Sequence, residues 1–237
     1  MPVSGPVTRS TLRQQIADAL RDEVLAGRLR PGREFTVKQI AEQYGVSATP
    51  VREALVDLSA QGLLDSDQHR GFRVHRFTVD DYRDMVEARF LIVDGVLRRH
   101  PEGGAEWGRV PDEVLVSVRR RAEAAVRAAR AGDLDILIGY DMRFWQELAG
   151  LAANRHLAGF LDRLRVQAWA FAVPHLRADR RVRDRLWAGY EELAEAVEEG
   201  SARRVAAVLA AYRAHSLNWA DHLERLPAPR EAPERPA

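Results

Sequence analysis

Apolar residues recur every three or four positions over the first part of the chain, which is the spacing of helices with one buried face. The first predicted helix carries Leu12, Ile16, Leu20 and Val24 on that face, and Gly27 ends it. A polar turn rich in Arg, Pro and Gly follows. This helix is therefore expected to pack against the elements that come after it.

Residues 37–58, VKQIAEQYGVSATPVREALVDL, predict two short amphipathic helices joined by a tight turn. Gly45 supplies the backbone freedom that the turn needs, and Ser47 suits the N-cap of the second helix. Pro50 falls in the first turn of that helix, where its missing N–H costs little. The buried face of the second helix is predicted to consist of Val51, Ala54, Leu55 and Leu58.

A helix pair of this form is typical of a helix-turn-helix, whose second helix lies in the major groove of DNA. Arg52 is placed to reach a guanine, and Thr49 or Ser47 to reach a phosphate or a base edge. A helical hairpin with a solvated arginine is the alternative, because isolated matches to this pattern occur in unrelated proteins. The residues that follow favour the DNA-reading interpretation.

The next stretch, LLDSDQHRGFRVHRFT, predicts a β-hairpin of two short strands. Leu63 and Leu64 lie on one strand, Phe72 and Val74 alternate on the other, and residues 68–71 form a polar tip. A basic tip that contains a glycine can approach a phosphate closely or place a side chain in the minor groove. Three helices followed by such a wing make a complete winged helix-turn-helix.

From Val79 onward the sequence shows helical periodicity and no strand pattern. Breaks at glycine, asparagine and proline positions, among them Pro174, divide this half into antiparallel helices joined by short loops. The predicted helices cover residues 79–97, 110–132, 134–152, 154–173, 184–200 and 202–226. The expected fold class is mainly α, with a winged helix-turn-helix followed by an all-α bundle.

The composition fits a chain of two parts. Its 237 residues exceed the commonest size of a single domain, and 46% of them are hydrophobic, enough for two cores. We expect a DNA-binding domain over residues 8–77, a helical domain over 78–226 and a disordered tail, PAPREAPERPA, over 227–237. The formal net charge of +1 is too small to indicate nucleic-acid binding by itself.

The absence of cysteine excludes disulfides, thiolate metal sites and cysteine catalysis, and it suits a reducing compartment. The sequence shows no apolar signal core at its start and no apolar run long enough to span a membrane. We therefore expect a cytoplasmic protein that does not associate with membranes.

Residues 10–77 resemble the winged helix-turn-helix of the GntR family of regulators. The family's entry pattern I..G.L.PG is seen as VLAGRLRPG, the run A...GVS.TPVREAL..L...GL is almost unbroken, and the hairpin is seen as HRGFRV. Ala48 departs from the family, whose members often carry a base-reading arginine there, so readout would depend more on Arg52, the wing and DNA shape. The DNA contacts that the resemblance implies fall on Lys38, Ser47, Thr49, Arg52, His69, Arg70 and Gly71.

The second half resembles the FCD domain, the helical effector-binding module of the FadR subfamily of GntR proteins. Its landmarks are an E-x-R motif that ends at Arg89, a G-D pair at residues 132–133, and DMRFWQEL, which begins at Asp141. They are followed by LAANRHL, by GYEELAEAVEEGS and by an A...H element that ends at His215. The resemblance implies a repressor that acts as a homodimer on a pseudo-palindromic DNA operator.

Many FCD domains hold a divalent metal ion with one aspartate and three histidines. Asp141 and His215 keep their places here, but Trp145 and Tyr190 stand where two of the histidines would be. An indole nitrogen has no lone pair for a metal and a neutral phenol is a poor ligand, so the site is degenerate. We expect no cofactor, with Asp141 and His215 as the residual candidates for binding zinc or nickel.

Two further histidines lie close in the sequence and are the alternative metal ligands. His156 follows an asparagine at a predicted helix start, and His175 is predicted to lie in a loop after Pro174. Neither position favours a metal site.

The resemblance then indicates a pocket for an organic ligand between the helices. Arg89 lies within an apolar helix, so it is either paired with Asp94 or Glu87 or held for the carboxylate of a ligand. The aromatic side chains could instead fill the core and leave no room. The predicted effector-binding residues are Arg89, Asp141, Trp145, Tyr190 and His215, with Trp169 as a further wall.

Two other classes of protein fit less well than a regulator whose operator affinity is modulated by a small molecule such as a carboxylate. An enzyme would use Asp141 and His215 as acid and base, but no nucleophile motif or phosphate-binding loop accompanies them. A constitutive DNA-binding dimer with a filled, ligand-free helical domain is the main alternative. The sensor requires a cavity, whereas the constitutive dimer does not.

Overall fold

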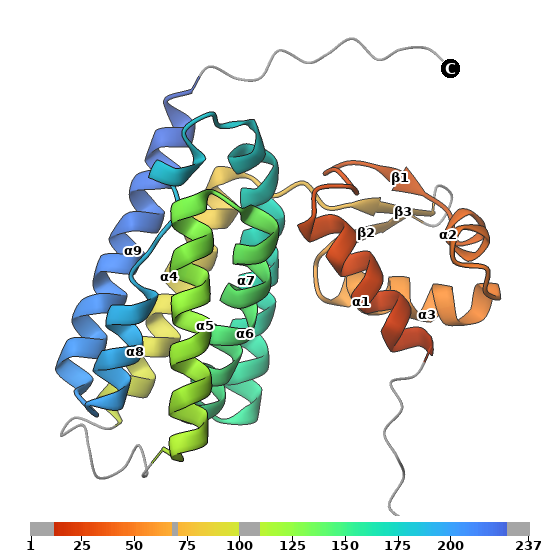
Figure 1. The fold of residues 1–237 in the computed structure, drawn as a ribbon. Coiled ribbons are helices and arrows are strands. Elements are labelled where there is room, and N and C mark those ends of the chain that lie inside the picture. Colours follow the sequence, from red (N-terminus) through yellow and green to blue (C-terminus); the bar gives the residue numbers. More distant parts are fainter. Residues whose placement is uncertain (1–11, 68–70, 100–109, 227–237) are drawn as a thin grey trace, which may run out of the picture.

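The computed structural model describes residues 12–67, 71–99 and 110–226 of the chain. Figure 1 shows a small N-terminal part, made of helices and short strands, beside a bundle of longer helices. The predicted fold class is confirmed: the chain is mainly α, with a helix-turn-helix and a small sheet followed by an all-α bundle.

The N-terminal part contains three helices and a three-stranded antiparallel sheet of strand order β1-β3-β2. Helices α1 and α2 both pack against α3. The predicted buried face of α3 is confirmed at Val51, Ala54, Leu55 and Leu58, each at most 1% exposed. The elements are α1 (Leu12–Leu25), β1 (Glu34–Phe35), α2 (Val37–Tyr44), α3 (Ala48–Ala60), β2 (Leu64–Asp67) and β3 (Gly71–Val74).

Local hydrogen bonds fix both ends of α2. The side chain of Thr36 accepts a bond from the backbone N–H of Gln39, and the Gln39 side chain accepts one from the backbone N–H of Thr36. Gly45 ends the helix with a φ of 64°, in the left-handed region that suits glycine. Ser47 precedes α3 as predicted, but its side chain makes no capping hydrogen bond.

The sequence interpretation missed strand β1, which pairs with β3. The predicted hairpin is present as β2 and β3, although residues 68–70 at its tip lie outside the described residues. Gly71 opens β3 with a φ of 92°, and a Cβ there would lie 2.7 Å from the backbone oxygen of Phe35. Close approach of β1 therefore requires a glycine at this position.

Six α-helices make up the bundle in the described part of the second half. Helix α5 packs against α6 and α8, α4 packs against α7 and α9, and α6 packs against α7. No helix among the described residues is long and apolar enough to cross a membrane. The helices are α4 (Val79–Arg98), α5 (Asp112–Ala131), α6 (Leu134–Ala152), α7 (Arg155–Ala178), α8 (Tyr190–Glu198) and α9 (Ala202–Glu224).

The predicted break at Pro174 is wrong, because α7 continues through it to Ala178. His175, predicted to lie in a loop, is therefore helical, and its ring centroid lies 4.8 Å from that of Phe171. A proline inside a helix costs one backbone hydrogen bond. Burial of Phe171 and Leu176, on either side of the proline in the chain, offsets that cost.

Two further details of the predicted helices need correction. The fifth helix of the bundle begins at Tyr190 and not at residue 184, because a short 3-10 helix, Val182–Asp184, precedes it. Leu12 lies in the first turn of α1 and is 46% exposed, so only the later apolar residues of that helix contribute to the core.

The two parts of the molecule touch along α7. Nε2 of Gln167 donates a hydrogen bond of 2.7 Å to the backbone oxygen of Gln61, just after the end of α3. Helix α7 also contacts α1, and a Cβ at Gly27 would lie 3.3 Å from the side chains of Val173 and Arg177. The bundle therefore contacts the helix-turn-helix directly.

Candidate functional site

The N-terminal turn of α3 presents polar side chains to solvent. Ser47, Thr49 and Arg52 are all exposed, and Arg52 forms no ion pair with the described residues. Val56 lies one turn after Arg52 and is 54% exposed, although it is a large apolar residue on an otherwise well-packed helix. The sequence interpretation did not single out Val56, which belongs to the exposed surface of α3.

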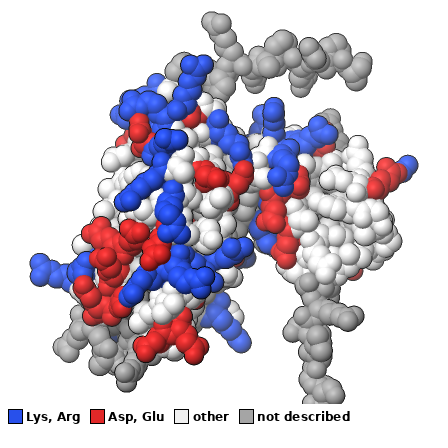
Figure 2. Space-filling view, in the orientation of Figure 1, with Lys and Arg blue, Asp and Glu red and all other residues white. Residues whose placement is uncertain are grey.

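The other predicted DNA contacts lie on α2 and on the wing. Lys38 is exposed, and its Nζ lies 3.8 Å from Oε1 of Glu42. This ion pair is too exposed to hold the lysine firmly. His69 and Arg70 lie outside the described residues, and the close approach of β1 explains the glycine at position 71. Figure 2 shows acidic and basic side chains interspersed over this face of the bundle.

The aromatic side chains predicted for the effector site converge on one buried carboxylate. Asp141 is 1% exposed and accepts hydrogen bonds from Trp145 Nε1 at 2.9 Å, from Trp169 Nε1 at 2.6 Å and from Tyr190 Oη at 2.8 Å. Nη1 of Arg165 lies 3.3 and 3.2 Å from its two oxygens. We call these residues the Asp141 cluster: Asp141, Trp145, Arg165, Trp169 and Tyr190.

The Asp141 cluster is satisfied internally. The guanidinium of Arg165 balances the carboxylate, lies 4.2 Å from the centroid of the Trp145 ring, and donates to Tyr212 Oη at 3.2 Å. Burial, followed by the nearby charge of Asp141, raises the pKa of the Tyr190 phenol well above its usual value, so the phenol stays protonated and donates. The cluster therefore holds a charged pair together without a ligand.

His215 lies apart from this hydrogen-bond network. Its Nε2 donates to the backbone oxygen of Arg185 at 2.9 Å. Burial lowers the pKa of the imidazole, which this hydrogen bond only partly opposes. His215 is therefore neutral at pH 7 and one of its nitrogens is occupied by a carbonyl group.

Arg89 does not form either predicted local ion pair. It is 8% exposed, and its Nε donates to the backbone oxygen of Met85 at 3.3 Å. Asp94 pairs instead with Arg98 at 2.7 Å. Arg89 therefore enters the bundle without a carboxylate partner among the described residues.

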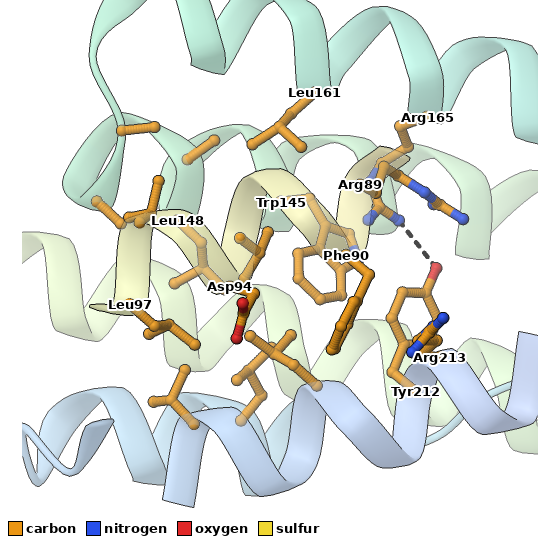
Figure 3. Close-up of a pocket in the computed structure, with 18 of the residues that line it drawn as sticks. Arg89, Phe90, Asp94, Leu97, Trp145, Leu148, Leu161, Arg165, Tyr212 and Arg213 are labelled. Carbon is orange, nitrogen blue, oxygen red and sulfur yellow. Dashed lines mark hydrogen bonds between the residues drawn. The ribbon is translucent and has the colours of Figure 1, made fainter. Parts of the chain in front are cut away.

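A second feature of the bundle is a cavity of about 210 Å³ between α4, α6, α7, α8 and α9, which we call the apolar cavity. Figure 3 shows Arg89, Arg165, Tyr212 and Arg213 at one end, with Leu97 and Leu148 toward the other. Other apolar walls are provided by Leu151, Leu161, Leu193, Val197 and Leu209. A smaller pocket of about 70 Å³ lies at the predicted position, lined by Arg89, Asp141, Trp169, Tyr190 and His215 among others, whereas Trp145 lines the apolar cavity.

Three residues of these sites were missed from the sequence: Arg165, Tyr212 and Arg213. Arg165 stands in α7, whose other arginines are exposed, and Arg213 stands in α9, where Arg203 is exposed, so residue type alone did not distinguish them. Arg165 has a signal in its apolar neighbours, because Leu164, Val166 and Ala168 flank it on a buried stretch.

Both halves of the chain match known protein families. Residues 12–74 match the bacterial regulatory proteins of the gntR family, and residues 84–215 match the FCD domain. The chain belongs to the GntR family. It is a DNA-binding transcriptional regulator with an FCD domain, and not an enzyme.

Relatives of this GntR protein include two named regulators. "Probable D-xylose utilization operon transcriptional repressor" of Paenarthrobacter nicotinovorans is 31% identical over 201 residues, 81% of this chain and 86% of that protein. The regulator YdhC of Bacillus subtilis, whose function is uncharacterized, is 28% identical over 153 residues, 62% of this chain and 64% of that protein. The structure of E. coli McbR/YncC shares the fold, with a TM-score of 0.72 at 20% identity, and covers 92% of this chain and 100% of its own.

The divalent metal site of the FCD resemblance does not fit these side chains. Asp141 already accepts from three neutral donors and an arginine, and His215 is bound to a carbonyl group. Among the described residues, no group of three or more His, Cys, Asp or Glu side chains could hold a metal ion. In this GntR regulator a cation of the protein itself, Arg165, lies where the carboxylate needs positive charge.

Proposed function

We propose that this GntR regulator is a cytoplasmic repressor that binds a pseudo-palindromic operator as a homodimer and changes its operator affinity when a small molecule binds the helical domain. The observation that carries the proposal is the position of α7. This helix lines the apolar cavity and also contacts the DNA-binding part.

The DNA-reading half of the proposal rests on α3. Its first turn is exposed, and Ser47, Thr49 and Arg52 are not committed to strong contacts within the protein. Hydroxyl groups and backbone N–H groups at a helix start bind phosphate, and an arginine binds the O6 and N7 atoms of guanine in two-point contact. His69, Arg70 and Lys38 are proposed to add phosphate contacts.

The coupling half of the proposal rests on α7. Leu161 and Arg165 face the apolar cavity, while Gln167, only two residues after Arg165, is bonded to the backbone oxygen of Gln61. A ligand that shifts α7 therefore acts on the C-terminal end of the recognition helix. The ligand can change DNA affinity only by the difference in its own affinity for the two arrangements.

A homodimer is proposed because a two-fold operator requires two recognition helices. Leu91 on α4 is 60% exposed and Val116 on α5 is 54% exposed, so each of these two helices carries a large apolar side chain on the outside that a dimer interface could cover. Sedimentation of the purified chain is expected to give twice the chain mass of 26.7 kDa.

The saturated Asp141 cluster favours one alternative, a constitutive dimer whose aromatic side chains fill the helical domain. That alternative explains why the predicted pocket residues bond to one another. It does not explain the apolar cavity beside them, which a constitutive dimer would have no need to keep open.

The test starts by selecting operator sequences from random DNA with the purified full-length protein. We expect the selected sequences to be pseudo-palindromic, and Arg52→Ala to weaken operator binding by about 1–3 kcal/mol. Arg120→Ala, an exposed arginine of the bundle, is the matched control and should bind as the parent does. Equal operator binding by the Arg52→Ala and parent proteins would refute the role of α3.

A further inference from the structure

We propose that the apolar cavity binds a small amphipathic organic anion, a monocarboxylate with an aromatic ring or a short alkyl chain, and that Arg213 and Arg89 hold its carboxylate. This inference rests on the proposed function, since it names the class of molecule that the regulator senses. It places the ligand beside the Asp141 cluster and not within it.

The size of the apolar cavity limits the ligand. Its volume is about 210 Å³. A cavity of roughly 150 Å³ is already large enough to bind benzene. One ring with a short side chain, or an alkyl chain of comparable volume, therefore fits, whereas a nucleotide or a long lipid does not.

The walls of the apolar cavity favour a ligand that is mostly apolar. Leu97, Leu148, Leu161, Leu193 and Val197 line it, and few polar atoms face it. Each hydroxyl group of a sugar would need a partner there, because an unpaired buried hydroxyl loses its hydrogen bonds to water. A polyhydroxylated ligand is therefore disfavoured, even though one relative is named for the utilization of D-xylose.

One end of the apolar cavity carries uncommitted positive charge. Nε of Arg213 is buried and has no hydrogen-bond partner, and its guanidinium lies 4.2 Å from the centroid of the Phe90 ring. Arg213 and Arg89 form no ion pair with the described residues. Figure 3 shows both arginines beside Tyr212, at the end of the cavity opposite Leu97.

The carboxylates that line the apolar cavity do not neutralise this end. Asp94 is paired with Arg98. Burial raises the pKa of Asp162, which reduces its tendency to carry a charge. Arg165 is committed to Asp141, so the charge left for a ligand is that of Arg89 and Arg213. A buried nitrogen without a partner, such as Nε of Arg213, is costly, and a ligand carboxylate would supply its hydrogen bond.

The test uses 3-phenylpropionate as the probe and 3-phenylpropionamide as its neutral match, with the full-length protein. We expect the carboxylate to raise the melting temperature and to bind, by calorimetry, at least about tenfold more tightly than the amide. D-xylose and citrate should produce no shift. Absence of binding by the carboxylate, equal binding of carboxylate and amide, or a larger shift with D-xylose would overturn the proposal.

Variants locate the site. Arg213→Gln should remove the preference for the carboxylate over the amide, whereas Arg203→Gln, an exposed arginine on the same helix, should keep it. Ala149→Phe, which fills the apolar cavity, should weaken both probes about tenfold or more while leaving selected operator sequences bound. If the Arg213→Gln protein keeps the preference for the carboxylate over the amide, the anion binds elsewhere and the assignment to Arg213 is overturned.

The two proposals fail in different ways. Full-length protein that binds its operator but neither probe would overturn the ligand class and leave the DNA-binding regulator standing. A carboxylate that binds with the expected preference, yet leaves operator affinity unchanged, would support the site and overturn its role in regulation.

Discussion

The Asp141 cluster and the apolar cavity lie beside each other in the bundle, and they differ in whether their polar groups have hydrogen-bond partners. In the cluster every donor around Asp141 is directed at one carboxylate, and Arg165 supplies the balancing charge. In the cavity Arg213 keeps an unbonded buried nitrogen, and apolar walls enclose open volume. A network whose hydrogen bonds are all formed stabilises the fold, whereas a ligand can supply the missing hydrogen bonds of polar groups that line an open cavity.

An unusual side chain in the bundle can therefore either stabilise the fold or be available to a ligand. The aromatic residues that attracted attention in the sequence, Trp145 and Tyr190, belong to the satisfied network. The described residue with an unpartnered buried nitrogen is Arg213, which the sequence interpretation missed, and Arg89 beside it forms no ion pair with the described residues. Four substitutions or conditions test whether the two regions differ in this way.

The largest effect is expected at the centre of the Asp141 cluster. Arg165→Met leaves the buried carboxylate of Asp141 without its counter-charge, and breaking a buried ion pair on one side costs about 3–5 kcal/mol. The free energy of unfolding, measured in urea by circular dichroism, gives this loss directly. Arg163→Met serves as control, because Arg163 lies on the exposed side of the same helix. A loss no larger than that of the control would show that the cluster is not the stabilising network described here.

A smaller effect is expected from a single neutral donor of the Asp141 cluster. Tyr190→Phe removes a hydrogen bond of 2.8 Å to Asp141, and one bond to a charged group contributes about 1.5–3 kcal/mol. The loss should fall near the lower figure, since the two indoles and Arg165 keep their bonds to the carboxylate. Tyr140→Phe on α6 is the comparison, because Tyr140 is not a donor to Asp141. Equal losses for the two phenols in urea titrations would contradict the assignment.

The parts of the fold that local chemistry determines were predictable. Helical spacing and caps gave α2, α3 and most of the bundle, because a glycine in the left-handed region or an Asn cap acts within a few residues. Strand β1 and the passage of α7 through Pro174 were not predictable. Both depend on tertiary contacts, with β3 in one case and with the bundle core in the other.

The candidate sites divide in the same way. The exposed positions of Ser47, Thr49 and Arg52 follow from the helix-turn-helix pattern, because a short amphipathic helix has only one face to bury. The convergence of four donors on Asp141 involves three helices, and the unmet capacity of Arg213 depends on what surrounds it. No spacing along the chain contains that information.

An effect of opposite sign is expected at the apolar cavity. Arg213→Leu removes a buried nitrogen that has no hydrogen-bond partner, and it adds apolar surface beside Phe90. We expect the free energy of unfolding without ligand to be unchanged or to rise by up to about 1 kcal/mol, since an unsatisfied buried group destabilises the fold. Urea titrations of this variant beside Arg165→Met measure the contrast between the two regions. A loss as large as that of Arg165→Met would mean that Arg213 has a stabilising partner.

The smallest effect concerns pH and lies at the edge of the Asp141 cluster. Burial lowers the pKa of His215 in the folded protein, whereas in the unfolded chain the pKa is near the usual 6.5. At acid pH the unfolded state therefore binds more protons, and the contribution of His215 to stability is present above pH 6.5 and is lost as the pH falls through the folded pKa.

His215→Gln keeps a donor for the Arg185 carbonyl without a titrating group, so its melting temperature should fall less than that of the parent between pH 7.5 and 5.5. His156→Gln changes an exposed histidine and should keep the parent's slope. Identical slopes for the His215→Gln and parent proteins would mean that this imidazole is solvated enough to titrate freely in the fold.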